Sequence, residues 1–256
     1  MSGDARCALV TGASTGIGRA IAVAFGELGW RVALASRRAD PLAEATAAVR
    51  AAGGETFSTP LDVGDAQAVE TFLDALTDDL GPVDVLVNNA GIGPPGTLAE
   101  RSPEDLEREV RTNLIGPMLL SRLVITQLEE RGAPGDLVFV SSDSTRNPRP
   151  LQAPYSATKA GVEGLASALA LELEGTQIRC IKLRPGPVIT EFSREWDPDG
   201  FDELLRQWRR FGLQRHLEAL APEDVAAAVV YAVTAPRTVH LDTIEIQPLA
   251  PRSPAS

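Results

Sequence analysis

Short runs of apolar and β-branched residues alternate with longer amphipathic patterns along almost the whole chain. Strand–helix–strand alternation requires right-handed crossovers between parallel strands. Several of the short runs are almost wholly apolar, which is expected where helices cover both faces of a sheet. The sequence therefore predicts an α/β fold with one doubly wound parallel sheet. Its expected strands cover residues 6–10, 31–35, 56–61, 83–87, 136–140, 178–183 and 243–246.

The amphipathic patterns predict helices between these strands. Two helix starts are marked by a capping residue followed by proline, Asp40-Pro41 and Ser102-Pro103. An Asp or Ser side chain accepts hydrogen bonds from the first amides of a helix, and proline lacks the amide that would stay unpaired. The expected helices cover residues 17–28, a stretch that starts at 40–41, and residues 103–130 and 154–174.

Length and composition predict one domain. A chain of 256 residues with 23% charged residues has the size and composition of one α/β domain. No linker or internal repeat divides it, so we expect a single domain over residues 1–248. Residues 249–256, rich in Pro, Ala and Ser, are expected to form a mobile tail.

The net charge and the small numbers of Cys and His exclude several functions. The formal net charge of −11 opposes binding to nucleic acid or to anionic lipid. The first residues lack a signal-peptide pattern, and the apolar runs are too short to span a bilayer, so we expect a cytoplasmic protein with no membrane contact. With two Cys and two His, neither a metal site nor a disulfide framework is expected, and Cys7 and Cys180 are predicted to be buried.

A glycine-rich segment, T-G-A-S-T-G-I-G at residues 11–18, joins the first predicted strand to the first helix. Glycine permits a sharp turn and a close approach of backbone amides to a pyrophosphate, and the helix N-terminus adds partial positive charge. The alternative is a tight turn that binds nothing. The flanking strand and helix favour a Rossmann-type dinucleotide site. Its residues are Gly12, Ser14, Thr15, Gly16, Ile17 and Gly18.

The spacing of these glycines resembles the T-G-x-x-x-G-x-G signature of the short-chain dehydrogenase/reductase family. Three further motifs follow in the family's order: Asn88-Asn89-Ala90-Gly91, the Y-x-x-x-K of residues 155–159, and Pro185-Gly186 with Thr190 beyond it. The resemblance covers about residues 5–248. It implies an oxidoreductase that interconverts a ketone and a secondary alcohol with a nicotinamide dinucleotide.

Tyr155 and Lys159 are four residues apart and therefore share one face of a helix. A phenol ionises near pH 10, and a neighbouring ammonium group is expected to lower that pKa. The resemblance implies that Tyr155 exchanges a proton with the substrate oxygen and that Lys159 also binds the nicotinamide ribose.

Two further catalytic residues follow from the resemblance. Ser142 is expected to donate a hydrogen bond to the substrate oxygen. Its neighbour Ser141 is the alternative, but successive strand residues face opposite sides, so only one can point at the substrate. Asn113 is expected to hold a water in a proton relay to the lysine, the alternative being a surface position on the long helix.

The end of the second strand, Ser36-Arg37-Arg38, predicts the cofactor. An acidic residue here would bind the ribose 2′-hydroxyl of NAD, whereas arginine pairs with the 2′-phosphate of NADP. We therefore expect NADP(H), with NAD(H) the alternative if both arginines are solvated. Further cofactor contacts implied by the resemblance are Asp62, Val63, Asn89, Ala90, Gly91, Pro185, Gly186, Val188 and Thr190.

The polar segment 143–149 departs from the family pattern, because family members commonly carry a glycine within three residues of the serine. Asp143, Arg146 and Arg149 are candidate substrate contacts. The alternative is a solvated loop or a subunit contact.

Residues 191–221 interrupt the alternation and occupy the position of the family's substrate-covering segment. Trp208 and Phe211 are expected to face inward. They predict a pocket for a small or medium substrate, apolar or cyclic, or an acyl-type ketone. The alternative is that this helix face packs on the core.

Two other functions remain open at this point. The same residues could serve an epimerase or dehydratase that uses its nucleotide transiently, or a non-enzymatic NADP sensor or scaffold. The resemblance also implies a homo-oligomer, a tetramer or dimer, built on the helices of residues 103–130 and 154–174.

Overall fold

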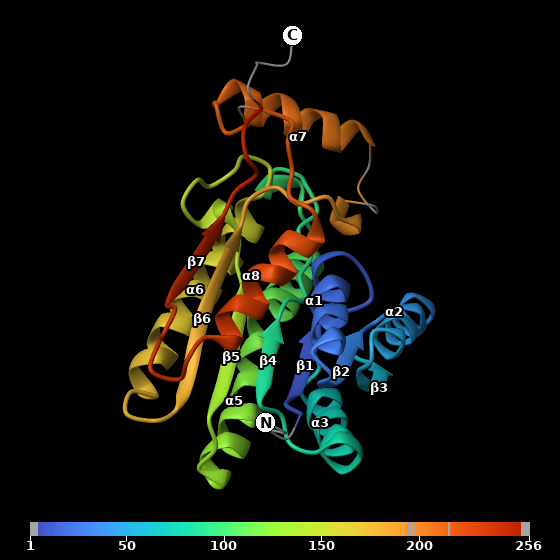
Figure 1. The fold of residues 1–256 in the computed structure, drawn as a ribbon. Helices are drawn as coiled ribbons and strands as arrows, with labels where there is room; N and C mark the ends of the chain where they lie inside the picture. The colour runs from blue at the N-terminus through green and yellow to red at the C-terminus, as the bar shows by residue number, and fades with distance from the viewer. Residues whose placement is uncertain (1–4, 194–195, 197, 215, 252–256) are drawn as a thin grey trace.

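One parallel sheet organises the molecule (Figure 1). The computed structural model describes residues 5–193, 196, 198–214 and 216–251. The strand order is β3-β2-β1-β4-β5-β6-β7, and every pairing is parallel, which confirms the predicted doubly wound α/β fold. The strands are β1 (Cys7–Thr11), β2 (Arg31–Ser36), β3 (Glu55–Pro60), β4 (Val85–Asn88), β5 (Gly135–Val140), β6 (Ile178–Pro185) and β7 (Thr243–Ile246).

Helices cover both faces of the sheet. The helices are α1 (Gly16–Glu27), α2 (Ala39–Ala51), α3 (Ala66–Leu80), α4 (Pro103–Val110), α5 (Gly116–Arg131), α6 (Ala153–Glu172), α7 (Pro198–Arg210) and α8 (Pro222–Thr234). Short helical segments are η1 (Leu98–Glu100), η2 (Arg111–Ile115), η3 (Asp143–Thr145) and η4 (Glu191–Ser193). In Figure 1, α7 lies beyond the carboxyl ends of the strands.

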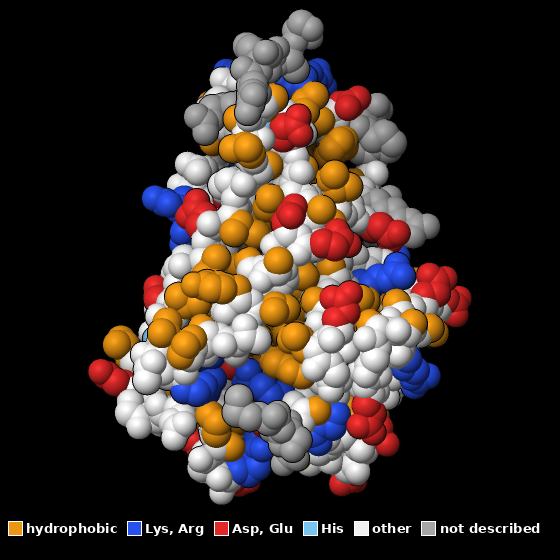
Figure 2. Space-filling view, viewed as in Figure 1, with side chains coloured by type: hydrophobic (Ala, Val, Ile, Leu, Met, Phe, Trp, Pro, Cys, Tyr) orange, Lys and Arg blue, Asp and Glu red, His pale blue; other side chains and the backbone are white. Residues whose placement is uncertain are grey.

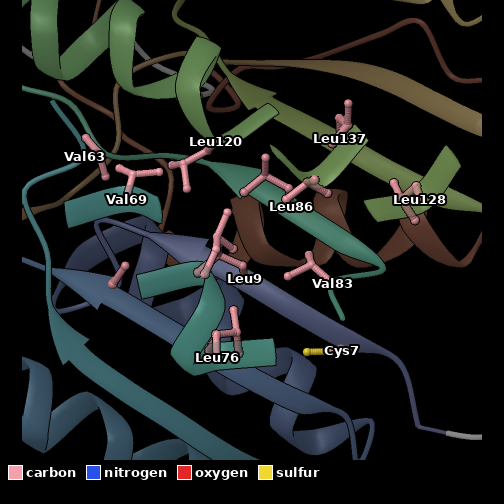
Figure 3. Packing of buried hydrophobic residues seen from close by; sticks show 14 of the residues in the cluster. Cys7, Leu9, Val63, Val69, Leu76, Val83, Leu86, Leu120, Leu128 and Leu137 are labelled. Atoms are coloured by element: carbon pink, nitrogen blue, oxygen red, sulfur yellow. The ribbon is translucent and has the colours of Figure 1, made fainter. Parts of the chain in front are cut away.

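Alternating strand residues build two separate cores. In β1, Cys7 and Leu9 face α3 and α5, while Ala8 and Val10 face α1 and α8. Figure 3 shows Leu9 packed among labelled leucines of α3, β4 and α5. Because both faces of a central strand are buried, its sequence is apolar throughout rather than alternating.

One of the two predicted helix starts is confirmed and the other is wrong. Ser102 caps α4 by accepting a hydrogen bond from the Asp105 amide at 3.1 Å, with Pro103 as the first helical residue, as predicted. The prediction for Asp40 is wrong, since α2 already begins at Ala39. Asp40 lies instead within the first turn, where its charge favours the helix N-terminus.

Several features bear on the excluded functions. None of the described helices is both long and apolar enough to cross a bilayer. Within the described residues, no group of His, Cys, Asp and Glu is arranged to hold a metal ion.

Cys7 and Cys180 are free and buried, and burial raises both thiol pKa values to about 12. On the face shown in Figure 2, acidic and basic side chains are interspersed.

A fully buried carboxylate, Asp136, forms ion pairs at the amino-terminal ends of the strands. It pairs with Arg6 at 2.6 Å, Arg179 at 2.7 Å and Arg237 at 3.0 Å. The Arg179 guanidinium also donates to backbone carbonyls after α8, including that of Val239 at 2.7 Å. One carboxylate therefore connects β5 and β6 to the segments that enter and leave the sheet.

We expect Asp136→Asn to lower the free energy of unfolding by about 3–5 kcal/mol, because the buried Arg179 would lose its counter-charge. Denaturant unfolding measures the change. Glu70→Gln is the matched control, since the Glu70–Arg122 pair lies at the surface and should contribute less than about 1 kcal/mol. Equal effects of the two substitutions would contradict this account.

Candidate active site

The site lies at the carboxyl ends of β1 and β4. These strands are neighbours, but the chain continues from β1 toward β2 and β3, and from β4 toward β5 and β6. The chain connections therefore diverge at this point, which is the usual ligand position in a doubly wound sheet.

The glycine segment forms the turn from β1 into α1. Gly12 and Gly16 have φ of +63° and +53°, which side chains rarely adopt. A Cβ on Gly18 would lie 2.3 Å from the Gly12 carbonyl oxygen. The N-cap residue of α1, Thr15, makes no side-chain capping bond, so the first amides of the helix can receive an anion.

Thr11 and Asn89 brace this turn against the loop after β4. The Thr11 hydroxyl oxygen accepts hydrogen bonds from the Asn89 and Ala90 amides, both at 3.0 Å. The Asn89 side chain donates to the carbonyls of Thr11 at 2.8 Å and Gly12 at 3.3 Å. The sequence prediction included Asn89 but missed Thr11, whose signal is its fixed place before the first glycine.

Polar groups at the end of β2 adjoin the same turn. The Ser36 hydroxyl donates to the Ser14 hydroxyl oxygen at 2.9 Å, and Arg38 lies 3.4 Å from the Thr15 hydroxyl oxygen. Arg38 also pairs with Glu191 at 3.5 Å, and both side chains are substantially exposed. Arg37 is exposed. Of the two arginines, Arg38 is therefore the one placed beside the start of α1.

The remaining predicted cofactor residues line the strand ends. Asp62 is exposed after β3 and accepts from the Gly64 amide at 2.9 Å, while Val63 is buried. After β6, the Gly186 amide donates to Ile246 at 2.8 Å, and Val188 pairs with Leu220.

Thr190 reaches across to the glycine turn. A Cβ built on Gly16 would lie 3.1 Å from the Thr190 side chain. Thr190 therefore lies against the first residue of α1.

Lys159 is buried at the carboxyl end of β5. Its Nζ donates to the Val140 carbonyl at 2.8 Å, and burial lowers the pKa of the ammonium group to about 8. A Cβ on Gly91 would lie 3.5 Å from both this Nζ and Asn113 Oδ1. The loop after β4 therefore passes directly over the lysine.

Tyr155 lies on the same face of α6, with its ring centroid 5.7 Å from Lys159 Nζ. Burial raises the phenol pKa to about 12, although a hydrogen bond with Ser142 opposes the shift. The predicted lowering by Lys159 is therefore wrong for the protein without ligand. The ammonium group bonds to the Val140 carbonyl, and burial is the largest influence on the phenol pKa.

The two neighbouring serines face opposite ways. Ser142 has extended backbone geometry and lies near enough to Tyr155 to oppose the rise of the phenol pKa, and its oxygen accepts from the Ser144 amide at 3.2 Å. Ser141 instead donates to Glu163 Oε1 at 2.6 Å. The structure thus brings Ser142, rather than Ser141, to the tyrosine.

Asn113 lies in η2, a π-helical segment that interrupts the predicted continuous helix of residues 103–130. It is buried rather than exposed. Its side chain accepts from the Ile92 amide at 2.8 Å and donates to the Ile92 carbonyl at 2.7 Å and to Thr158 Oγ1 at 3.1 Å. Single-turn π segments are frequent at functional sites, and this one joins the loop after β4 to α6.

The polar segment after Ser142 divides into two parts. Asp143 and Arg149 form a nearly buried ion pair whose charges both act on Tyr155. Arg146 is largely exposed and pairs with Glu245 of β7 at 2.9 Å. Of the three candidate substrate contacts, only Asp143 and Arg149 adjoin the site.

Aromatic side chains of the covering segment reach the phenol. The Phe192 ring centroid lies 5.6 Å from that of Tyr155 and 5.5 Å from that of Trp196. Gly93 is required beside them, since its Cβ would lie 2.5 Å from the tyrosine ring. Phe192 was not predicted as a site residue, and its place two residues after Thr190 was the available signal.

The inward-facing prediction for α7 holds only in part. Trp208 packs under the Arg149 guanidinium at 4.2 Å from its ring centroid. Phe211 is 59% exposed, so its prediction is wrong. The helix ends at Arg210, and the turn at Gly212 directs the chain away from the helical periodicity.

Known proteins resemble this chain over most of its length. A family model described as short chain dehydrogenase matches residues 6–200. L-Rhamnose 1-dehydrogenase (NAD(P)(+)) from Sphingomonas sp. (strain SKA58) is 33% identical over 236 residues, 89% of each chain. Glycine betaine reductase ATRR from Emericella nidulans is 34% identical over 243 residues, and this chain spans 19% of that longer protein.

Solved structures agree with the sequence comparisons. A single-substitution variant of actinorhodin polyketide ketoreductase, solved with NADPH, superimposes with a TM-score of 0.83 at 32% identity, covering 96% of this chain and 97% of the other. The family match spans the glycine turn, the Y-x-x-x-K helix and the six strands that carry them. We conclude that the chain belongs to the short-chain dehydrogenase/reductase family of oxidoreductases.

Proposed function

We propose that this chain is an NADP(H)-dependent enzyme that interconverts a ketone and a secondary alcohol. One observation carries the proposal. Ser142 adjoins the Tyr155 phenol, whose ring centroid lies 5.7 Å from the Lys159 ammonium group, and the loop over Lys159 is hydrogen-bonded to Thr11 at the start of the glycine turn.

The residues present fit a dinucleotide. The uncapped amides of α1 and the glycine turn would hold the diphosphate, and Arg38 with Ser36 would hold the 2′-phosphate. Asp62 would lie near the adenine, and Lys159 near the nicotinamide ribose. When bound, the reduced nucleotide supplies a hydride. The ketoreductase neighbour is solved with NADPH and another reductase neighbour with NADH, so the choice of NADP(H) rests on Ser36 and Arg38 at the end of β2.

The pKa of Tyr155 indicates that this phenol is the proton donor. Burial keeps Tyr155 protonated throughout the neutral range, so the phenol can donate to the oxygen of a ketone as its carbon is reduced. Ser142 would donate a hydrogen bond to the same oxygen and stabilise its developing charge. Below its pKa of about 8, Lys159 adds a positive charge to this region.

The surroundings favour an uncharged substrate of small or medium size, apolar or cyclic. Phe192 and Trp196 supply an apolar wall. The acidic groups that act on Tyr155 are both paired, Asp143 with Arg149 and Glu109 with Arg101.

We extend the proposal to a homo-oligomer, a dimer or tetramer. The helices concerned are α4, α5 and α6. Each exposes a large apolar side chain, Val110, Met118 and Leu171 respectively, and burial of such groups favours association. Light scattering of the purified protein tests this extension, and a monomer would contradict it.

We expect Tyr155→Phe to lower kcat for ketone reduction about 10²–10⁴-fold, because the proton donor is removed while the apolar ring stays. The dissociation constant for NADPH should change little. Consumption of NADPH, followed by absorbance, gives kcat, and stoichiometric consumption also excludes a transient use of the nucleotide. Tyr231→Phe, at an exposed tyrosine, is the control. If Tyr155→Phe kept a tenth of wild-type kcat, the assignment would fail.

We expect the wild-type protein to prefer NADPH over NADH in kcat/KM. Arg38→Ala should raise KM for NADPH about 10-fold or more, the equivalent of one charge-assisted hydrogen bond, and leave KM for NADH nearly unchanged. Arg37→Ala is the matched control and should have the smaller effect. A wild-type preference for NADH would refute the NADP(H) assignment.

A further inference from the structure

Glu163 connects the catalytic helix to the segment that carries Ser142. It lies on α6, one turn beyond Lys159, with its side chain largely buried. Its Oε1 accepts from Ser141 Oγ at 2.6 Å and from Arg184 Nε at 2.9 Å, and Thr145 Oγ1 lies 2.9 Å from it. Its Oε2 accepts from Arg184 Nη2 at 2.7 Å.

These contacts flank Ser142 on both sides. Ser141 precedes it directly, and Thr145 closes the turn after it, since the Thr145 amide donates to the Ser142 carbonyl at 3.1 Å. Glu163 therefore fixes the two ends of the short segment whose middle presents the Ser142 hydroxyl. Tyr155 lies on the same helix as Glu163. The Ser142 and Tyr155 hydroxyl groups are therefore both held in place relative to α6.

The surroundings of Glu163 favour its ionised carboxylate. Burial opposes ionisation, but hydrogen bonds from Arg184, Ser141 and Thr145 hold the pKa of Glu163 below its usual range. An ionised carboxylate accepts several donors at once, whereas an amide would turn donor hydrogens toward one of them.

The ion pair with Arg184 does not account for the two hydroxyl contacts. Arg184 has a second carboxylate partner, Glu245, at 2.9 Å. Glu245 also pairs with Arg146, and among the described residues it bonds to neither of the two hydroxyl groups. The two glutamates thus share one arginine, and only Glu163 binds the segment around Ser142.

We propose that Glu163 is a positioning residue, which holds residues 141–145 on α6 so that the Ser142 and Tyr155 hydroxyls converge on one substrate oxygen. This inference rests on the proposed function. An error of about 1 Å in such a group can lower turnover 10²-fold.

The first experiment compares Glu163→Ala with Glu245→Ala, which also removes one partner of Arg184. We expect Glu163→Ala to lower kcat at least about 10-fold while KM for NADPH stays within about 2-fold. Glu245→Ala should keep wild-type kcat. Equal losses in the two variants, or an unchanged kcat in Glu163→Ala, would overturn the proposal.

A double-mutant cycle separates positioning from a general structural role. In the Ser142→Ala background, Glu163→Ala should cause no further loss of kcat, because the group that it positions is absent. A loss as large as in the wild-type background would overturn the proposal.

A second variant keeps the test valid if Glu163→Ala does not fold. Ser141→Ala removes the shortest hydroxyl contact of Glu163 and leaves intact both the Glu163–Arg184 pair and the hydrogen bond from the Thr145 hydroxyl to the Ser142 carbonyl. It should reproduce a loss of kcat in the same direction, and wild-type turnover in this variant would contradict the inference. If the proposed function itself were wrong, the wild-type protein would not consume NADPH stoichiometrically with a ketone, whereas failure of this inference alone would leave that activity and its loss in Tyr155→Phe unchanged.

Discussion

The burial of one ammonium group at the carboxyl end of β5 is the constraint on which the site depends. Lys159 is 4% exposed and bonds to the Val140 carbonyl, which fixes α6 against the strand that leads to Ser142. Burying a charge with one carbonyl partner is unfavourable, as the lowered pKa of about 8 shows. A catalytic site that lowers stability in this way is a frequent compromise in enzymes.

The same burial acts on Lys159 and Tyr155 in opposite directions. A low-dielectric environment favours the neutral form of each group, so it lowers the lysine pKa and raises that of the phenol. The Tyr155 phenol remains a proton donor at every pH below its pKa of about 12. Lys159 is a cation only below its pKa of about 8. The sequence spacing places the pair on one face, but the depth of burial decides which group holds its proton.

Local patterns predicted most of the fold, and the motifs that resemble the family predicted residues that the structure brings together at one end of the sheet. Apolar runs located the strands, because central strands are buried on both faces, and the motif spacings located the residues at their carboxyl ends. Tertiary contacts were beyond such patterns. Asn113 lies in a π segment that bonds Ile92 and Thr158, and Glu163 meets Ser141 across 22 residues of sequence. The pKa direction of Tyr155 was missed for the same reason.

Direct titration of Tyr155 tests the central claim that burial holds this phenol protonated. The chain has two tyrosines, so Tyr231→Phe leaves Tyr155 as the single phenol whose ionisation changes the ultraviolet absorbance. In the folded protein without cofactor, we expect no ionisation as the pH passes the ordinary tyrosine pKa of about 10, since burial raises this pKa to about 12. Ionisation of Tyr155 at or below its ordinary pKa, while the protein stays folded, would contradict the account.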